Sequence, residues 1–252
     1  MPTILITGCS SGFGLETARY FLARGWSVIA TMRTPREDLF APSDRLRVLP
    51  LDVTDPASIQ AAVDAAGPID ALVNNAGVGL LSVVEGTPMD TVRALFETNV
   101  FGLMAVTRAV LPHLRERGTG VVDNVSSSTT LKPLPMLAVY TASKAAVNAF
   151  SESLALELAP VGVRVGLVLP GAAPATSFGQ NARARMEEQG VSLPEAYGDF
   201  AEGVFAAMAE YRTGPHTEAA DVAEAVWRAV TEPSLPLRMP AGADAVALAG
   251  AG

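Results

Sequence analysis

Short apolar runs alternate with longer amphipathic stretches along nearly the whole chain, and this alternation is the strongest constraint on its fold. The first run, residues 4–7, is followed by a glycine-rich turn at residues 8–14 and by a helical stretch at residues 15–24 that Gly25 ends. Strands that alternate with helices are connected in parallel. The pattern therefore predicts an α/β fold with a doubly wound parallel β-sheet of about seven strands and helices on both faces.

The remaining elements follow the same alternation. Further strands are predicted at residues 27–32, 47–51, 69–73, 120–125 and 163–169, with a short edge strand at 237–240. Helices are predicted at residues 56–66, from 88 to about 117 with a bend, at 140–158, and at 219–230 as the final helix. Residues 179–211 read as a mostly polar, helical insertion. Because no repeat or flexible linker divides the chain, we expect one domain over residues 1–252, with a segment at about 175–215 covering the site.

Composition excludes several classes of protein. The chain is 49% hydrophobic and 17% charged, which excludes a disordered chain. Its net charge of −8 argues against nucleic acid and against anionic membranes as partners. The single cysteine, Cys9, is expected to be a packing residue, and two scattered histidines do not suggest a metal site.

The sequence gives no sign of targeting to a membrane. No stretch of about 18 residues is apolar without charges or Gly/Pro breaks. The first residues enter a strand with no basic segment before it, so we expect no secretion signal. A cytoplasmic protein is the resulting expectation.

The turn at residues 7–14, TGCSSGFG, lies between a predicted strand and a predicted helix. Gly8 permits the tight turn, Gly12 lets the backbone approach a pyrophosphate, and Gly14 lets the helix pack on the sheet. The helix N-terminus offers free N–H groups and a positive dipole end to phosphate. The spacing differs from the usual Gly-x-Gly-x-x-Gly, and an ordinary tight turn is the alternative. In this context we expect a dinucleotide site.

The end of the second predicted strand indicates which dinucleotide binds. NAD sites usually have an acidic residue there, which holds the ribose 2′-OH. This chain has Met32, followed by Arg33 and then Arg36. A guanidinium suits a 2′-phosphate in charge and geometry. We therefore expect NADP(H) over NAD(H), the alternative being that both arginines are solvated loop charges.

Tyr140 and Lys144 stand four residues apart at the start of a predicted helix, so they face the same side. A free tyrosine has a pKa near ~10, and a neighbouring ammonium stabilises the phenolate and lowers that pKa. The two residues can therefore act as a general acid or base, although a surface helix pair has the same spacing.

Two polar residues could complete this group. Ser127 follows the fifth predicted strand, and its hydroxyl could bind a substrate carbonyl. Ser126 or Ser128 could bind the carbonyl instead, or these two serines could only form hydrogen bonds with backbone groups of the loop. Asn99 lies in the bent helical region, where it could have a local backbone partner or could hold a water against Lys144.

Together these motifs resemble the short-chain dehydrogenase/reductase family, in family order over nearly the whole chain. They include the glycine turn, Asp52, the sequence Asn74-Asn75-Ala76-Gly77, Asn99, Ser127, Tyr140, Lys144 and Pro170-Gly171. The first half is most similar to the NADP-preferring carbonyl-reductase and hydroxysteroid-type branches. The resemblance implies a Rossmann-like fold and hydride transfer between NADP(H) and a carbonyl or secondary alcohol.

The resemblance also implies roles for individual residues. Tyr140 would exchange a proton with the substrate oxygen, Lys144 would lower the pKa of Tyr140 and hold the nicotinamide ribose, Ser127 would orient the carbonyl, and Asn99 would keep a water in the proton relay. The residues implied to meet the cofactor are Gly8, Ser10, Ser11, Gly12, Phe13, Gly14, Arg33, Asp52, Val53, Asn75, Ala76, Gly77, Tyr140, Lys144, Pro170, Gly171 and Thr176.

Two positions depart from the family pattern. Asp123 lies inside the fifth predicted strand, where an unpaired carboxylate would cost stability. It either finds a partner or has a raised pKa. The family often has a threonine five residues after the proline of Pro170-Gly171, but this chain has Ala175 there and Thr176 one residue later. We assign Thr176 to the cofactor carboxamide.

The expected substrate is an apolar ketone or alcohol, because the predicted walls of the site contain Leu80, Leu81, Leu131, Leu134 and Met136. A non-catalytic NADP(H)-binding sensor on the same fold is one alternative. An epimerase or dehydratase is another, although those usually have an added C-terminal domain. The resemblance implies a homodimer or homotetramer built through helices at about residues 100–117 and 140–158.

Overall fold

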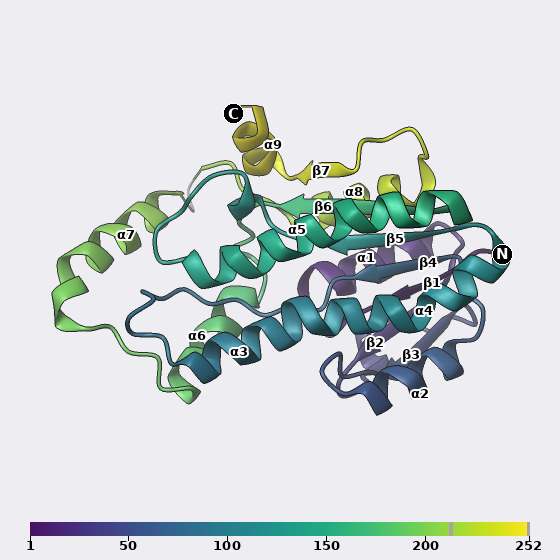
Figure 1. Cartoon of the computed structure of the whole chain (residues 1–252), viewed down its shortest axis with the longest axis horizontal. Helices are drawn as coiled ribbons and strands as arrows, with labels where there is room; N and C mark the ends of the chain where they lie inside the picture. The colour runs from purple at the N-terminus through teal and green to yellow at the C-terminus, as the bar shows by residue number, and fades with distance from the viewer. Residues whose placement is uncertain (212–213, 251–252) are drawn as a thin grey trace.

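The protein forms a parallel sheet covered by helices in a computed structural model that describes residues 1–211 and 214–250 (Figure 1). Within those residues the sheet has seven strands in the order β3-β2-β1-β4-β5-β6-β7. They are β1 (Thr3–Ile6), β2 (Ser27–Met32), β3 (Leu46–Pro50), β4 (Ala71–Asn74), β5 (Gly120–Val125), β6 (Val163–Pro170) and β7 (Arg238–Ala241). All pair in parallel, which confirms the predicted doubly wound sheet and the edge strand.

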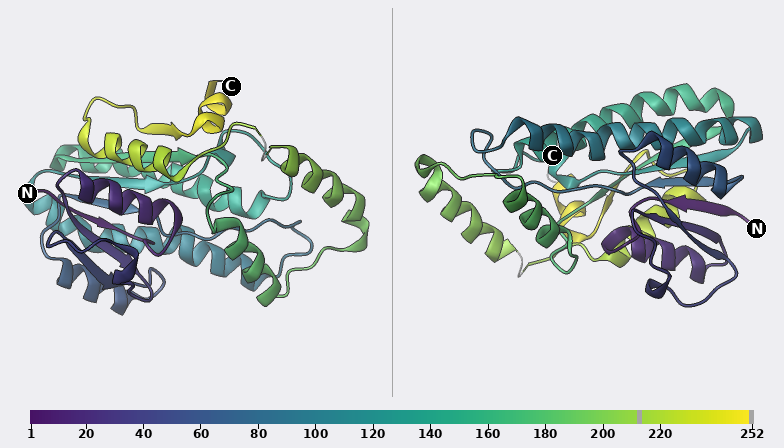
Figure 2. Two further views of the ribbon diagram at one scale, coloured as in Figure 1. Left: turned by 180° about the vertical axis from the view of Figure 1, so that it is seen from behind. Right: turned by 90° about the horizontal axis from the view of Figure 1, so that it is seen from below.

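Helices cover both faces of the sheet, as Figures 1 and 2 show. The helices are α1 (Gly12–Ala23), α2 (Pro56–Ala66), α3 (Met89–Phe96), α4 (Leu103–Arg117), α5 (Ala138–Leu158), α6 (Phe178–Glu188), α7 (Gly198–Tyr211), α8 (Ala219–Thr231) and α9 (Ala243–Gly250). Residues of α1 and α8 pack on one face in a cluster that includes Phe21 and Val226. Residues of α2, α4 and α5 pack on the other, around Val63, Val110 and Leu154.

The inner strands are mostly apolar because both of their faces are buried, whereas the edge strands β3 and β7 have exposed residues such as Arg47 and Arg238. On β5, Val121 and Val125 join the cluster under α1 and α8, while Val122 joins the cluster under α2, α4 and α5. Side chains alternate between the faces of a strand, so a strand covered twice needs apolar residues at consecutive positions. This is why the apolar runs located the strands within one or two residues.

The predicted bend in the helix after residue 88 is a π-helical segment, η2 (Glu97–Gly102), which joins α3 to α4. By length and composition alone the whole run, Met89–Arg117, could cross a membrane. Its residues Val106, Val110 and Leu114 are buried against the sheet, however, so the run packs as a core helix of the domain.

The end of the chain differs from the sequence-based expectation. The helix predicted to be the last one is α8, and it is followed by β7 and by one more helix, α9. The sequence of α9, ADAVALAG, is short and glycine-bounded, so its periodicity gave no helix signal. The predicted insertion forms α6 and α7, which lie beyond the carboxyl edge of the sheet (Figure 1). Residues 212–213 of the covering segment, the side chain of Tyr211 and residues 251–252 lie outside the description.

Asp123 is the main irregularity of the core. It is fully buried on β5, on the face that α8 covers, beside Gly166 and close to Ala229. Neither carboxyl oxygen has a hydrogen-bond partner within the described residues. Burial raises the pKa of Asp123 from 3.8 to about 8. Of the two possibilities that the sequence left open, the structure favours the raised pKa.

Asp123 should therefore make the stability of the fold depend on pH. The unfolded chain loses this proton near pH 4, whereas the folded protein keeps it until about pH 8. Between these values the folded state binds more protons, so the free energy of unfolding falls as pH rises, by up to about 6 kcal/mol. The Asp123→Asn variant lacks this dependence. Urea titrations at pH 5, 6.5 and 8 should show its advantage over the wild type growing with pH, and a constant difference would contradict this account.

Candidate active site

The sheet reverses its winding between β1 and β4, and hydrogen bonds join the ends of these two strands. The Thr7 hydroxyl accepts hydrogen bonds from the backbone N–H groups of Asn75 and Ala76, each at 3.0 Å. The Asn75 amide donates to the carbonyl oxygens of Thr7, at 2.9 Å, and Gly8, at 3.2 Å. Ligands of such sheets bind at this reversal, outside the carboxyl ends of the strands. Asn75, predicted to line the cofactor, holds the glycine turn against β4.

The glycine turn has no room for side chains at two of its positions. Gly8 has a φ of +75°, and a Cβ there would lie 2.8 Å from Cα of Ala76. A Cβ at Gly14 would collide with the Gly8 carbonyl and the Asn75 amide. Gly12, with a φ of +56°, is open except for Thr176. The tight packing thus involves Gly8 and Gly14, while Gly12 leaves its surface clear.

The first turn of α1 fits a phosphate group. Its N-cap residue, Ser11, makes no side-chain capping bond, and the turn contains no acidic residue. The first N–H groups of a helix lack intrahelical partners, and the helix dipole places positive potential there. Ser10 is exposed and Phe13 is half-buried at the same turn. The residues present therefore suit the pyrophosphate of a dinucleotide.

The carboxyl ends of β2 and β3 form the next part of the same edge of the sheet. Met32 is buried and Arg33 is exposed. Arg36 is engaged by Asp38, with 2.7 Å between Nη2 and Oδ2. Asp52 accepts hydrogen bonds from the backbone N–H and hydroxyl of Thr54, at 2.9 and 2.7 Å. The Thr54 N–H lowers the pKa of Asp52 most, with a smaller contribution from the charge of Arg33. Val53 beside it is buried against Gly102.

Tyr140, Lys144 and Ser127 meet at the end of β5. Tyr140 and Lys144 are 8% and 5% exposed on the first two turns of α5, so they are not a surface pair. Lys144 Nζ donates to the Val125 carbonyl at 3.0 Å. Ser127 hydrogen-bonds the Tyr140 phenol and accepts a hydrogen bond from the Thr129 N–H at 3.2 Å.

The two neighbouring serines are placed differently. The Ser126 hydroxyl is directed to Asn148 Oδ1 and the Lys144 carbonyl, which anchor the loop to α5. Ser128 begins the short helix η3 (Ser128–Thr130) and is buried. Only Ser127 of the three hydrogen-bonds Tyr140 in the described residues.

Asn99 lies within η2 and reaches across to the loop after β4. Its Oδ1 accepts from the Val78 N–H at 2.8 Å, and its Nδ2 donates to the Val78 carbonyl at 2.9 Å and the Ser143 hydroxyl at 3.2 Å. Its backbone partner is therefore distant in sequence. A Cβ at Gly77 would lie 3.3 Å from Asn99 Oδ1 and 3.5 Å from Lys144 Nζ. Gly77 thus leaves open the space between these two side chains.

Burial determines the protonation of the catalytic candidates. It raises the pKa of Tyr140 to about 12, with the Ser127 hydrogen bond acting in the opposite direction. It lowers the pKa of Lys144 to about 8. The expectation that Lys144 lowers the pKa of Tyr140 is not met here, because desolvation of the phenol dominates and the ammonium is directed to Val125. Burial also raises the pKa of the Cys9 thiol to about 12, which suits a packing residue.

The segment after β6 lies over the glycine turn and the tyrosine. Pro170 and Gly171 end β6 beside Ala241 of β7. Thr176 lies against Gly12, and its hydroxyl donates to the Ala173 carbonyl at 2.8 Å. Next in the chain, the Ser177 hydroxyl donates to Ser11 Oγ at 3.2 Å.

Phe178 continues this segment over the catalytic candidates. Its ring meets the Tyr140 ring edge-on, with 6.0 Å between centroids. A Cβ at Gly79 would lie 2.7 Å from the same ring, so α6 packs directly on the loop after β4. Phe178, from the segment that follows β6, therefore covers one side of the Tyr140 ring.

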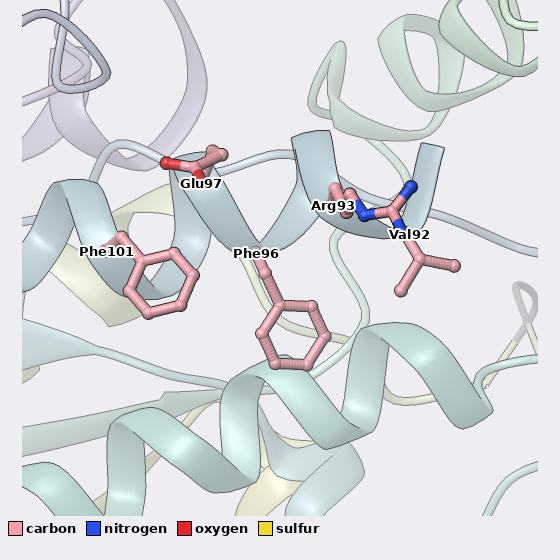
Figure 3. Close-up of a pocket in the computed structure, with 5 residues that line it drawn as sticks. All are labelled: Val92, Arg93, Phe96, Glu97 and Phe101. Carbon is pink, nitrogen blue, oxygen red and sulfur yellow. The ribbon is translucent and has the colours of Figure 1, made fainter. Parts of the chain in front are cut away.

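Two hollows of the surface lie away from these groups. One, of about 290 Å³, is lined by Val92, Arg93, Phe96, Glu97 and Phe101 on α3 and η2 (Figure 3). Another, of about 480 Å³, lies between α8, β7 and α9. Neither hollow is lined by Tyr140, Lys144 or the glycine turn. The candidate site is therefore located by these side chains and not by a hollow of the surface.

Sequence reasoning missed three contributors. The Thr7 hydroxyl joins β1 to β4, and Ser143 anchors Asn99. Asp244 of α9 receives a hydrogen bond from Ala172 at the start of the covering segment. Thr7 belonged to the glycine motif and could have been found there, but no signal in the sequence connects Asp244 with residue 172.

Comparisons with known proteins agree with this geometry. A model of the short chain dehydrogenase family matches residues 2–187. The protein is 46% identical over 178 residues to the uncharacterized oxidoreductase YusZ of Bacillus subtilis, covering 66% of this chain and 63% of YusZ. It is 40% identical over 172 residues to the 3-ketodihydrosphingosine reductase of Bacteroides thetaiotaomicron, covering 67% of this chain and 62% of that protein. The matches thus span less than two thirds of these relatives. The chain belongs to the short-chain dehydrogenase/reductase family.

Solved structures share the whole fold. A short-chain dehydrogenase from Streptomyces avermitilis superimposes with a TM-score of 0.84 at 36% identity, covering 100% of this chain and 92% of that one. A short chain dehydrogenase from Burkholderia cenocepacia in complex with NADP has a TM-score of 0.77 at 27% identity, with coverages of 99% and 91%. A 3-ketoacyl-(acyl-carrier-protein) reductase from Brucella melitensis complexed with NADH has the same TM-score and identity, with coverages of 95% and 96%. These neighbours support a nicotinamide cofactor without deciding between NADP and NAD.

The position of Gly77 allows a test of the site geometry. The Gly77→Ala variant adds a methyl group 3.3 Å from Asn99 Oδ1, so the Asn99 side chain must move by a few tenths of an ångström, and the methyl group occupies space beside Lys144 Nζ. Turnover should fall about tenfold or more, because small displacements of catalytic groups are costly, while the melting temperature changes little. The matched Gly203→Ala variant on exposed α7, where a Cβ meets no neighbour, should keep wild-type turnover. Equal turnover in both variants would contradict this placement.

Proposed function

We propose that the protein is an NADP(H)-dependent carbonyl reductase or alcohol dehydrogenase acting on an apolar ketone or secondary alcohol. The observation that carries the proposal is the meeting of Ser127, Tyr140 and Lys144 at the end of β5, next to a loop that Asn99 fixes. A non-catalytic sensor has no need for this buried group. In this proposal residues 1–252 act as one catalytic domain that residues 175–215 cover.

The proton is supplied by Tyr140. A pKa raised to about 12 keeps the phenol protonated at neutral pH, which suits a donor to a ketone oxygen. Ser127 has one hydroxyl proton, which it donates to the substrate oxygen, and so it orients the carbonyl for this proton transfer. Lys144, protonated below about pH 8, places a positive charge on the same side of α5. Asn99 and Gly77 keep the space beside the ammonium open for a water that returns the proton.

The nicotinamide cofactor, when bound, supplies or accepts the hydride. Gly12 and the open first turn of α1 would hold its pyrophosphate, with Ser10, Ser11 and Phe13 around it. Asp52 and Val53 would flank the adenine, and Ala76 with Gly77 would line the middle of the edge. Pro170, Gly171 and Thr176 would meet the carboxamide end. These assignments are the ones that the family resemblance implies, and the residues lie at the ends of strands that neighbour one another in the sheet.

An apolar substrate is supported by the surroundings of Tyr140. Tyr140 clusters with Leu80 and Leu95, and Met136 joins Val83, Leu81 and residues of α7 in a neighbouring cluster. Of the predicted wall residues, Leu131 instead packs toward Val147 under α5, and Leu134 is 38% exposed. The similarity to a protein named as a 3-ketodihydrosphingosine reductase also favours a ketone substrate.

The direct test is NADPH consumption with a panel of apolar ketones and aldehydes, followed by nicotinamide absorbance. The wild type should oxidise NADPH, and Tyr140→Phe should lose about 10²–10⁴-fold in kcat, because it loses the proton donor. Its affinity for NADPH should stay within a fewfold, since the ring is retained. Tight NADPH binding without turnover of any compound would favour the sensor instead.

Arg33 should determine the preference for NADPH. It is exposed at the end of β2, whereas Arg36 is engaged by Asp38. Losing a charge-assisted bond to the 2′-phosphate should weaken NADPH binding about tenfold or more in Arg33→Ala, with NADH binding unchanged. Fluorescence titration with both nucleotides measures this, and Arg36→Ala serves as the matched control. Equal losses for both nucleotides would overturn the assignment.

We also propose that two copies pair through α4 and α5. Leu156 on α5 is 79% exposed, and Phe101 at the start of this helix pair is 53% exposed beside the hollow of Figure 3. Light scattering should give a dimer or tetramer mass for the wild type and a smaller mass for Leu156→Glu. The Phe205→Glu variant, on exposed α7, should keep the wild-type mass. A wild-type monomer would contradict this arrangement.

A further inference from the structure

The segment that covers the site leaves the sheet and returns to it at a single point. The Thr217 N–H donates to the Ala172 carbonyl at 2.8 Å, and the Gly171 N–H donates to the Thr217 hydroxyl at 3.0 Å. Ala172 follows the end of β6, and Thr217 lies just before α8. The chain between Ala172 and Thr217, described for residues 173–211 and 214–216, therefore forms a long excursion that begins and ends at hydrogen-bonded residues.

One carboxylate holds both ends of this excursion. Asp244, in the first turn of α9 and 5% exposed, accepts a hydrogen bond from the Ala172 N–H at 2.7 Å and one from the Thr217 hydroxyl at 2.6 Å. Bonds to a buried charged acceptor are among the stronger ones in a protein. The contact is tight, because a Cβ at Gly171 would collide with the carboxylate and one at Gly242 would collide with Thr217.

The first residues of the excursion reach the proposed active site. Thr176 lies against Gly12 of the glycine turn, Ser177 donates to Ser11, and the Phe178 ring meets Tyr140. Only three residues separate Ala172 from Thr176. A displacement of the backbone at Ala172 would therefore also displace the residues that make these contacts. The helix α9 also lies beside η3, the turn that follows Ser127.

We propose that Asp244 is a positioning residue that fixes the covering segment over the active site from outside that site. It touches neither the phenol nor the glycine turn, and it acts through the backbone of residues 171–172 and through Thr217. The consequence for substrate binding rests on the proposed function. Under that function, Asp244 determines how well the substrate is enclosed, and the proton transfer at Tyr140 does not depend on it.

Hydrogen–deuterium exchange tests the positioning role without any substrate. In Asp244→Ala, peptides from residues 173–211 should exchange about tenfold faster or more, while peptides of β1 and β4 keep their wild-type rates. The matched control is Asp70→Ala. Asp70 accepts a hydrogen bond from the Thr3 N–H and pairs with Arg117 at the opposite edge of the sheet. That control should leave residues 173–211 unchanged. Wild-type exchange of the segment in Asp244→Ala, or equal acceleration throughout the chain, would overturn the proposal.

Steady-state kinetics provide a second readout. Asp244→Ala should raise KM for an accepted ketone about tenfold while kcat changes by less than about threefold, because enclosure is lost and the proton donor is retained. Asp244→Asn should be intermediate, since its amide keeps one acceptor oxygen. A loss confined to kcat would overturn the positioning role. If no ketone is reduced by the wild type, the proposed function fails, and the exchange experiment still decides whether Asp244 fixes the segment.

Discussion

The hydrogen bonds between Thr7 and Asn75 are the contact on which the rest of the edge depends. They join β1 to β4 where the sheet reverses its winding, and they hold the Gly8 carbonyl and the glycine turn in place. Once that turn is fixed, the N-terminus of α1 points along the carboxyl edge. The loop after β4 then passes Asn99 and Lys144, so the residues proposed to bind the nucleotide and those proposed to transfer the proton lie along the same edge of the sheet.

The active-site groups are polar residues in a largely buried environment, and this determines their chemistry. Desolvation keeps the Tyr140 phenol protonated and brings the pKa of Lys144 toward neutrality. Each group is hydrogen-bonded to backbone or to a neighbour, which limits the cost of burying it. Asp123 is the contrast, because it is fully buried and neither of its carboxyl oxygens has such a partner among the described residues.

Much of this organisation was predictable from the sequence because the inner strands, buried on both faces, are mostly apolar runs. The glycine turn and the Tyr140–Lys144 spacing could also be predicted, because their residues lie close together in the chain and form a recognisable sequence pattern. The helix α9 was missed because its eight residues, four of them alanine, are too few to show a clear helical periodicity. The contact of Asp244 with Ala172 joins residues 72 positions apart, and only the fold brings them together. The direction of the Tyr140 pKa shift was missed because burial of the phenol, which no spacing reveals, raises the pKa more than the Ser127 hydrogen bond lowers it.

The central claim is that this edge brings a nicotinamide and a ketone together so that hydride passes directly between them while Tyr140 supplies the proton. The most direct measurement uses NADPH carrying deuterium at C4, in each of its two positions, with a ketone that the protein accepts. The account predicts that deuterium from one of the two positions appears on the carbinol carbon of the alcohol, detected by mass spectrometry, with none lost to water. An alcohol free of deuterium from both cofactors would contradict direct hydride transfer.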